Sequence, residues 1–172
     1  MKDDVVLKLK MGDTSAFEKV YNDFFKKIYQ FVFFKVNNPS KAEDICSEVF
    51  LRFVKFVHNN DVDNVSAILY RIARNLIIDD SRKNKEDLVG DENMELIKDS
   101  NELNFDDKYI NNESLFLALS NLKDDYRDII VMYHINEMSL KDIADVFGKT
   151  QGATKTMLSR AMGQIRESFP QM

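Results

Sequence analysis

The chain has 172 residues, of which 44% are hydrophobic and 31% charged, with 5 Gly, 2 Pro and a formal net charge of -5. So few turn-forming residues argue against a β-sandwich or barrel, and the single cysteine, Cys46, excludes an intramolecular disulfide and a multi-cysteine metal site. The first residues lack the apolar run of a signal peptide and no run of about eighteen apolar residues occurs, so we expect a cytoplasmic protein without membrane insertion.

Two amphipathic helices are predicted at the start of the chain. Ser15 and Glu18 have the spacing of a capping box, and an apolar stripe follows until the sequence Asn37-Asn38-Pro39 interrupts it. Ser40 and Glu43 have the same spacing, and a wider apolar stripe then runs to about residue 57. The first stripe comprises Phe17, Val20, Tyr21, Phe24, Ile28, Phe31 and Val32, and the second comprises Ala42, Ile45, Cys46, Val49, Phe50, Phe53, Val54 and Val57.

The second helix carries an isolated leucine on the face opposite its stripe. Leu51 lies there among Asp44, Glu48, Arg52 and Lys55. Single exposed leucines are common in soluble proteins and usually carry no function. An apolar centre with a charged rim is also typical of a surface that binds another protein, so both interpretations stay open.

A third helix is predicted over about residues 65–83, after a polar loop. Its inward face comprises Ile68, Leu69, Ile72, Ala73, Leu76 and Ile77, and its outward face comprises Tyr70, Arg71, Arg74, Asn75 and Arg82. Basic side chains beside an aromatic ring suit single-stranded or distorted nucleic acid, because a base can stack on the ring while phosphates meet the guanidinium groups. An ordinary solvated helix surface is the alternative.

The acidic residues are concentrated in the middle of the chain. Residues 1–85 carry 15 Lys and Arg against 12 Asp and Glu, residues 86–112 carry 2 against 9, and residues 113–172 carry 7 against 8. The middle segment has the composition of a solvated linker, so we place a boundary there between domains 1–85 and 113–172. It could also hold one short helix around residues 94–97.

Short helices are predicted in the last part of the chain. Leu115, Leu119 and Leu122 indicate one helix, and Tyr126, Ile129, Ile130 and Tyr133 indicate another. Ser139 is positioned to cap a helix of two turns that Gly148 ends, and Thr150 to cap a final helix to about residue 168. The inward residues of these last two helices are Leu140, Ile143, Ala144 and Phe147, then Thr154, Leu158, Ala161 and Ile165.

Two short helices joined by a tight glycine turn have the geometry of a helix-turn-helix, which places its second helix in the major groove of DNA. The outward face of that second helix carries Gln151, Lys155, Thr156, Ser159 and Arg160. These residue types can donate to phosphate or to purine edges. An antiparallel helical hairpin with a solvated polar face is the alternative interpretation.

The sequence offers no convincing catalytic or metal site. His58 and His134 are far apart and have no cysteine or carboxylate at ligand spacing, and no glycine-rich phosphate loop or nucleophile motif occurs. Cys46 lies on an apolar stripe and is interpreted as a core residue. We therefore expect a protein that is not an enzyme and that needs no cofactor or metal.

Three segments occur together in one order: AEDICSEVFLRFVKF, then LYRIARNLIIDDSRK, then LSNLKDDYRDIIVMYHINEMSLKDIADVFGKTQGATKTMLSRAMGQIRE. They closely resemble the extracytoplasmic-function sigma factors, the two-domain sigma subunits of bacterial RNA polymerase, and the likeness runs from about residue 12 to residue 168. It implies an all-α fold with two small helical domains, a sigma2-like bundle and a sigma4-like helix-turn-helix, joined by the acidic linker. It further implies a factor that binds core polymerase, recognises the minus-35 and minus-10 promoter elements and helps to melt the promoter.

The resemblance also implies roles for individual residues. Docking on the clamp helices of the largest polymerase subunit falls to Asp44, Glu48, Leu51 and Arg52. Contact with the minus-10 element, including capture of a flipped base by the loop from His58 to Val65, falls to Asn64, Tyr70, Arg71, Arg74 and Asn75. Contact with the minus-35 element falls to Gln151, Lys155, Thr156, Ser159 and Arg160. The polymerase flap and an anti-sigma factor are further partners that the resemblance suggests.

The chain departs from the family pattern at several positions. Ile68 stands where Trp is frequent, Thr154 and Met157 stand where Val and Arg are usual, and Met162 replaces a common Arg. Fewer cations predict weaker, less salt-sensitive minus-35 binding, and the Thr154 hydroxyl needs a bond to a carbonyl of the preceding turn. The rival interpretation is a polymerase-independent helix-turn-helix regulator that binds DNA as a dimer.

Overall fold

The computed structural model describes residues 2–87 and 113–168, which are helical with no strand. The all-α prediction is therefore confirmed. The chain divides into two compact units, Met1–Asn101 and Glu102–Met172. The predicted linker 86–112 lies almost wholly outside the described residues, and so does the short helix suggested at 94–97. None of the helices within the described ranges is long and apolar enough to cross a membrane.

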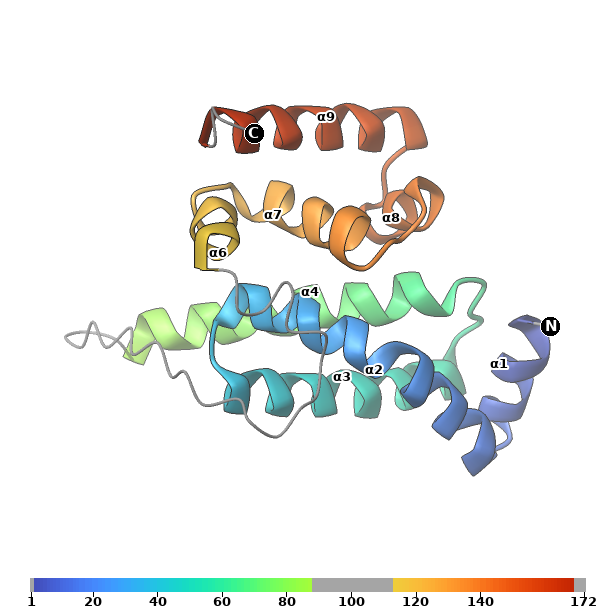
Figure 1. Ribbon diagram of the computed structural model, residues 1–172. Helices are drawn as coiled ribbons and strands as arrows, with labels where there is room; N and C mark the ends of the chain where they lie inside the picture. The colour runs from blue at the N-terminus through green and yellow to red at the C-terminus, as the bar shows by residue number, and fades with distance from the viewer. Residues whose placement is uncertain (1, 88–112, 169–172) are drawn as a thin grey trace. The chain divides into compact units, whose positions relative to one another are not determined.

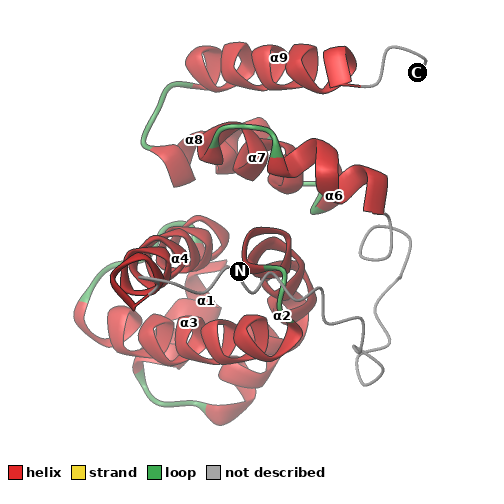
Figure 2. Cartoon of the chain, turned by 90° about the vertical axis from the view of Figure 1, so that its left-hand side faces the viewer, coloured by secondary structure: helices red, strands yellow, loops and turns green. Residues whose placement is uncertain are grey.

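The first unit consists of α1 (Lys2–Lys10), α2 (Thr14–Val36), α3 (Pro39–Asn59) and α4 (Val65–Asp87). Helices α2, α3 and α4 pack around a common core, and α1 lies against α2 and α3 (Figures 1 and 2). The fully buried side chains at the centre of this core include Ile28, Phe31, Val49, Phe53 and Leu69. An ion pair of 2.8 Å between Lys41 Nζ and Asp80 Oδ2 adds a polar link from α3 to α4.

The starts of α2 and α3 differ from the predicted capping boxes. The Asp13 carboxylate caps α2, because its Oδ1 accepts from the Ser15 N–H at 2.9 Å and from the Ala16 N–H at 3.4 Å. Asn38 caps α3 by accepting from the Lys41 N–H at 3.1 Å. Pro39 is suited to the first helical position since it has no N–H to satisfy, which moves the cap to the residue before it.

The second unit consists of α6 (Glu113–Ser120), α7 (Asp124–Ile130), the π-helical turn η1 (Val131–Ile135), α8 (Leu140–Phe147) and α9 (Gln151–Ser168). Helix α9 packs against α7 and α8, with Ile129, Ile143 and Ala161 fully buried. This part of the chain therefore has its own apolar core, built from all three of these helices.

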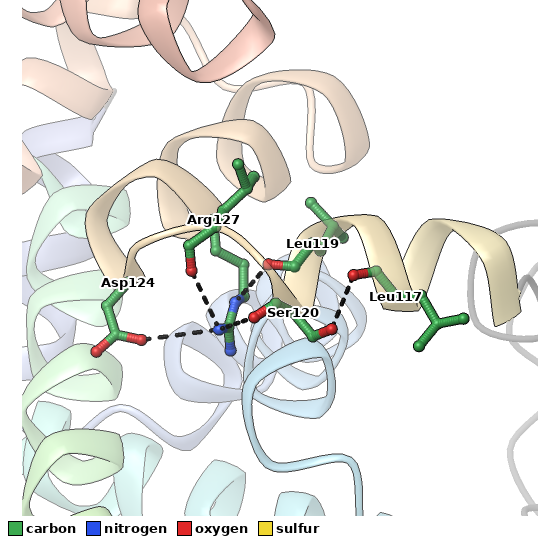
Figure 3. Close-up of polar contacts among 6 residues, drawn as sticks. Leu117, Leu119, Ser120, Asp124 and Arg127 are labelled. Carbon is green, nitrogen blue, oxygen red and sulfur yellow. Dashed lines mark hydrogen bonds and ion pairs between the residues drawn. The ribbon is translucent and has the colours of Figure 1, made fainter. Parts of the chain in front are cut away.

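The Arg127 side chain fixes the turn between α6 and α7 (Figure 3). Its guanidinium donates to Leu119 O at 3.0 Å and to Ser120 O at 3.3 Å, at the carboxyl end of α6, and lies 4.0 Å from the Asp124 carboxylate. A cation at this end of a helix satisfies carbonyls that have no partner within the helix. One side chain of α7 thus caps α6.

The π turn changes which side chains of the second unit face the core. The Asn136 N–H bonds to Val131 O at 2.8 Å, five residues back, so one extra residue is accommodated in the turn. Met132 becomes fully buried, while Tyr133 is 37% exposed. Tyr133 shares the helical spacing of Ile129 and Ile130 in the sequence but is not buried with them, because regular α-helical spacing does not continue past Ile130.

Candidate nucleic-acid and protein interfaces

The outer face of α3 has the orientation that the sequence predicts. Asp44, Leu51 and Arg52 are exposed, Leu51 at 60%, whereas Cys46 on the opposite face is fully buried. Glu48 is partly exposed and its Oε1 accepts from Arg52 Nε at 3.0 Å. This ion pair is an i,i+4 pair on the helix surface, and Leu51 lies beside it on the same outer face of α3.

The loop between α3 and α4 is held by side-chain amides at both of its ends. The Asn60 side-chain amide donates to Phe56 O at 3.0 Å, at the end of α3. The Asn64 side-chain oxygen accepts from the Ala67 N–H at 3.1 Å, at the start of α4. Between them, Val62 is only 6% exposed and anchors the loop to the core. Asn64 therefore has a structural role as the cap of α4, beside its predicted place at a nucleic-acid surface.

The outward face of α4 includes most of the predicted basic residues but not the predicted ring. Arg71 and Asn75 are exposed and Arg74 is partly buried. Tyr70 is fully buried and meets the Phe31 ring edge to face, with centroids 5.3 Å apart and an interplanar angle of 72°. The prediction of Tyr70 as an exposed stacking ring is wrong, because Tyr70 lies on the inward face of α4, at helical spacing from buried Ala73 and Ile77, and packs there against Phe31.

An exposed apolar side chain on α4 was missed by the sequence analysis. Ile78 is 44% exposed and follows Arg71 and Asn75 at helical spacing, with Arg82 one turn beyond it. Its spacing from Arg71 and Asn75, both predicted to face outward, was the signal in the sequence that could have identified it. We call the residues Arg71, Asn75, Ile78 and Arg82 the basic strip of α4.

The helix-turn-helix of the second unit is built as predicted. Ser139 Oγ accepts from the Asp142 N–H at 3.1 Å, Gly148 ends α8 in the left-handed conformation with φ 63°, and Thr150 Oγ1 accepts from the Ala153 N–H at 3.1 Å. Thr154 is buried, and its hydroxyl donates to Thr150 O at 2.8 Å. This is the bond to a carbonyl of the preceding turn that the sequence predicted for a hydroxyl in an apolar contact. Glycine is favoured at Gly148 because a left-handed residue with a Cβ is strained.

The outward residues of α9 all lie at the surface. The set is Gln151, Lys155, Thr156, Ser159 and Arg160, each of them exposed. The predicted core residues Thr154, Ala161 and Ile165 are buried, and Met157 joins them at 7% exposed. A polar face of hydroxyl, amide and cationic groups is thus presented along one side of the helix that follows the turn.

A hollow of about 650 Å³ lies next to this face. Its lining includes Thr156 and Arg160 of α9, Lys149 of the turn, and Lys123 with Asp124 from the start of α7. The sequence gave no indication of this arrangement, because the α7 residues are more than twenty positions away in the chain. The lining of the hollow carries charges of both signs, with Lys123, Lys149 and Arg160 against Asp124 and Asp125.

Burial governs the titration of Cys46 and Tyr29 in the first unit. Burial raises the pKa of the Cys46 thiol to about 12. Burial raises the pKa of Tyr29 to about 12 as well, with smaller contributions from Glu43 and Cys46. Both groups therefore stay protonated and unreactive at neutral pH. Across residues 2–87 and 113–168, no three His, Cys, Asp or Glu side chains are close enough to hold a metal ion.

Comparison with known proteins assigns both units. The family model described as sigma-70 region 2 matches residues 20–87, and the model described as sigma-70, region 4 matches residues 112–165. The chain is 32% identical to the ECF RNA polymerase sigma factor SigW of Bacillus subtilis, over 95% of this chain and 94% of that protein. It is 24% identical to SigM of the same organism, over 88% of this chain and 94% of that one.

Solved structures share the fold. CnrH in complex with the cytosolic domain of CnrY aligns with a TM-score of 0.70 at 17% identity, covering 95% of this chain and 93% of that one. The sigma factor RpoE in complex with the anti-sigma factor NepR from Bartonella quintana aligns with a TM-score of 0.68 at 22% identity, covering 90% and 97%.

Proposed function

The chain belongs to the extracytoplasmic-function sigma factors of the sigma-70 family, which direct promoter-specific transcription initiation, and we propose that its two units divide this work. The first unit binds core RNA polymerase and the minus-10 element, and the second binds the minus-35 element. The functional boundaries follow the charge pattern, with domains at 1–85 and 113–172 and an acidic connector at 86–112. The protein acts in the cytoplasm, where the polymerase is.

We assign core polymerase binding to the outer face of α3. Leu51 is the apolar centre of this contact, and Asp44, Glu48 and Arg52 form its charged rim. The partner is the pair of clamp helices of the largest polymerase subunit. A half-exposed leucine beside a pre-formed Glu48–Arg52 ion pair supports this assignment, because burying the leucine on binding is favourable and the charges select the partner.

We assign minus-10 recognition to the loop before α4 and to the basic strip of α4. Arg71 and Arg74 would meet phosphates of the non-template strand, and Asn64 and Asn75 would border the pocket for a flipped base. Melting a promoter requires unstacking bases at a cost of a few kcal/mol, and a protein that holds the extruded base and nearby phosphates lowers that cost. Because Tyr70 is buried, the contact with the base must come from the loop rather than from stacking on that ring.

We assign minus-35 recognition to α9. Gln151, Lys155, Thr156, Ser159 and Arg160 are the side chains available to base edges and phosphates of the major groove. With only two cations in this set, the second unit should bind its element weakly, and with a shallow salt dependence, in the absence of polymerase. The flap of the polymerase is the proposed partner that holds this unit in place.

We expect the protein to contribute promoter choice and no catalytic group, cofactor or metal. The polymerase carries out RNA synthesis, while the sigma subunit stabilises the open promoter through contacts made in that state. Two proteins of similar fold have been solved with the cytosolic domain of CnrY and with the anti-sigma factor NepR. A protein partner of this kind, which would cover one of the proposed surfaces, is therefore a second proposed partner.

One observation supports this function most directly. The same chain holds a capped helix-turn-helix with an exposed polar face on α9 and, on the outer face of α3, an exposed leucine among charged residues. The test is reconstitution of the chain with core polymerase on a library of random promoter fragments, followed by sequencing of the transcripts. Transcripts that share a minus-35 and a minus-10 element support the proposal. Transcripts with no shared element, or none above the level of core enzyme alone, contradict it.

A further inference from the structure

An ion pair joins the first helix of the chain to the loop before α4. Lys10 Nζ lies 2.9 Å from Asp61 Oδ1, and the two residues are 51 positions apart. Lys10 lowers the pKa of the Asp61 carboxyl, first through this hydrogen bond and then through its charge. Figure 1 shows α1 at the same end of the first unit as the turn that connects α3 and α4.

Helix α1 is fixed to the bundle and is not a loose terminal segment. The Asp13 N–H bonds to Lys8 O at 3.0 Å and the Gly12 N–H bonds to Leu9 O at 3.0 Å, which is the Schellman arrangement, with Gly12 at φ 77°. Asp13 is at the same time the cap of α2, so one residue ends α1 and begins α2. Val6 and Leu9 are buried against the rest of the unit. The backbone of Lys10 is therefore held in a fixed place.

The loop between α3 and α4 is held by three anchors of its own and by a contact with Lys10 of α1. Asn60 is bound to the end of α3, Val62 is buried, and Asn64 caps α4. Asp61 lies between the first two of these anchors, and its side chain, which is 99% exposed, accepts from the Lys10 ammonium at 2.9 Å. A loop fixed in advance loses less conformational freedom when it binds a ligand, and so binds more tightly.

We propose that α1 positions the minus-10 loop, with Lys10 and Asp61 as the positioning residues. This inference rests on the proposed role of that loop in binding a base of the non-template strand. Helix α1 lies outside residues 20–87, the segment that matches the sigma-70 region 2 model. The ion pair thus extends the functional part of the first unit to a helix that precedes that segment.

Removing the charge of Asp61 changes DNA binding in opposite directions if Asp61 positions the loop and if it acts only through its electric field. A carboxylate beside a DNA surface repels phosphates, so removing its charge would strengthen DNA binding if Asp61 acted only through its field. If Asp61 instead holds the loop through Lys10, removing its charge weakens DNA binding. Asp61→Asn, which keeps the side-chain shape, therefore separates the two cases.

The experiment uses holoenzyme assembled from the full chain and core polymerase. Its binding to a fluorescent single strand carrying the non-template minus-10 sequence is compared with its binding to a scrambled strand. We expect Lys10→Ala and Asp61→Asn each to weaken binding of the specific strand roughly two- to fivefold, the range for an exposed ion pair. The double variant should be no weaker than either single one. Most of the affinity should return when the charges are swapped in the double variant Lys10→Asp with Asp61→Lys. Lys10→Arg alone should keep most of the wild-type affinity.

Lys8→Ala is the matched control. Lys8 lies on the same helix, but its ion pair of 3.2 Å is with Asp4, within α1, so its loss removes the same charge without releasing the loop. Equal losses for Lys8→Ala and Lys10→Ala, or tighter binding by Asp61→Asn, would overturn the inference. Wild-type holoenzyme that binds both strands equally would overturn the proposed minus-10 function itself, and the inference with it. If wild-type holoenzyme prefers the specific strand and the Lys10 and Asp61 variants bind that strand with the same affinity, the inference is overturned and the proposed minus-10 function stands.

Discussion

The cap that Arg127 places on α6 should contribute measurably to the stability of the second unit. Arg127→Met keeps an unbranched aliphatic stem and removes the donors to Leu119 O, Ser120 O and Leu122 O, at 3.0, 3.3 and 3.5 Å. The contact of 4.0 Å with Asp124 is too long for a hydrogen bond and adds little.

The size of the effect follows from what remains after the substitution. Leu119 O still accepts from the Leu122 N–H at 3.1 Å, and Ser120 is exposed to water, so neither carbonyl is left wholly without a partner. The loss is then close to that of one hydrogen bond from a charged donor, about 2 kcal/mol of unfolding free energy. For a unit of this size the same loss lowers Tm by about 10 °C.

The assay needs a signal from the second unit alone, and the absence of Trp from the chain makes this simple. Tyr133→Trp places one fluorophore in η1, at a position that is 37% exposed and tolerant of a larger ring. Urea unfolding of the full chain in this background reports the second unit. Arg166→Met is the matched control, because Arg166 is exposed on α9 and its loss should cost less than about 0.5 kcal/mol. Equal unfolding midpoints for the two variants would refute the role given to Arg127.

The remaining predictions concern the proposed contacts and one core hydroxyl. Replacing Leu51 and Arg52 together by Ala should weaken association with core polymerase and leave helicity by circular dichroism intact, since both side chains are exposed; unfolding would contradict this. Lys155→Ala should cost about 1 to 3 kcal/mol if the side chain reads a base edge, and should alter minus-35 preference without changing core binding. Unchanged transcription across a library of minus-35 sequences would remove that lysine from the site. Thr154→Val should change the unfolding free energy by less than about 1 kcal/mol, because Thr150 O keeps its bond of 3.0 Å from the Thr154 N–H; urea unfolding with a larger loss would show that the hydroxyl matters.

Features set by neighbouring residues could be predicted from the sequence. Ser139, Gly148 and Thr150 define the helix-turn-helix through caps and a left-handed turn, each of which involves atoms a few positions apart. The hydrogen bond of the Thr154 hydroxyl is local in the same way. The exposure of Leu51 followed from helical spacing alone, because the opposite stripe of α3 is long and unambiguous.

Features set by contacts between distant residues could not be predicted. Tyr70 is an exception, because its spacing of three and seven residues from Ala73 and Ile77 already favours the inward face on which it pairs with Phe31. The extra residue in η1 moved Tyr133 outward although its sequence fits a regular helix. Lys10 and Asp61 have nothing in the sequence to connect them, and α1 itself is short with a mixed pattern in which Leu7 is exposed beside buried Val6.

The central claim is that the two DNA surfaces act together only when polymerase fixes their spacing. In this account only helix α9 of the second unit is weakly basic, and the acidic connector between the two surfaces provides little preorganisation. A dimeric repressor, by contrast, binds its duplex alone at about 10 nM or tighter.

The direct measurement is a footprint on promoter duplex with permanganate probing, carried out with and without core polymerase. We predict weak protection by the chain alone, and specific protection together with permanganate-reactive thymines around minus 10 once core polymerase is added. A clear and symmetric footprint from the chain alone, with no change on adding core polymerase, would contradict the account.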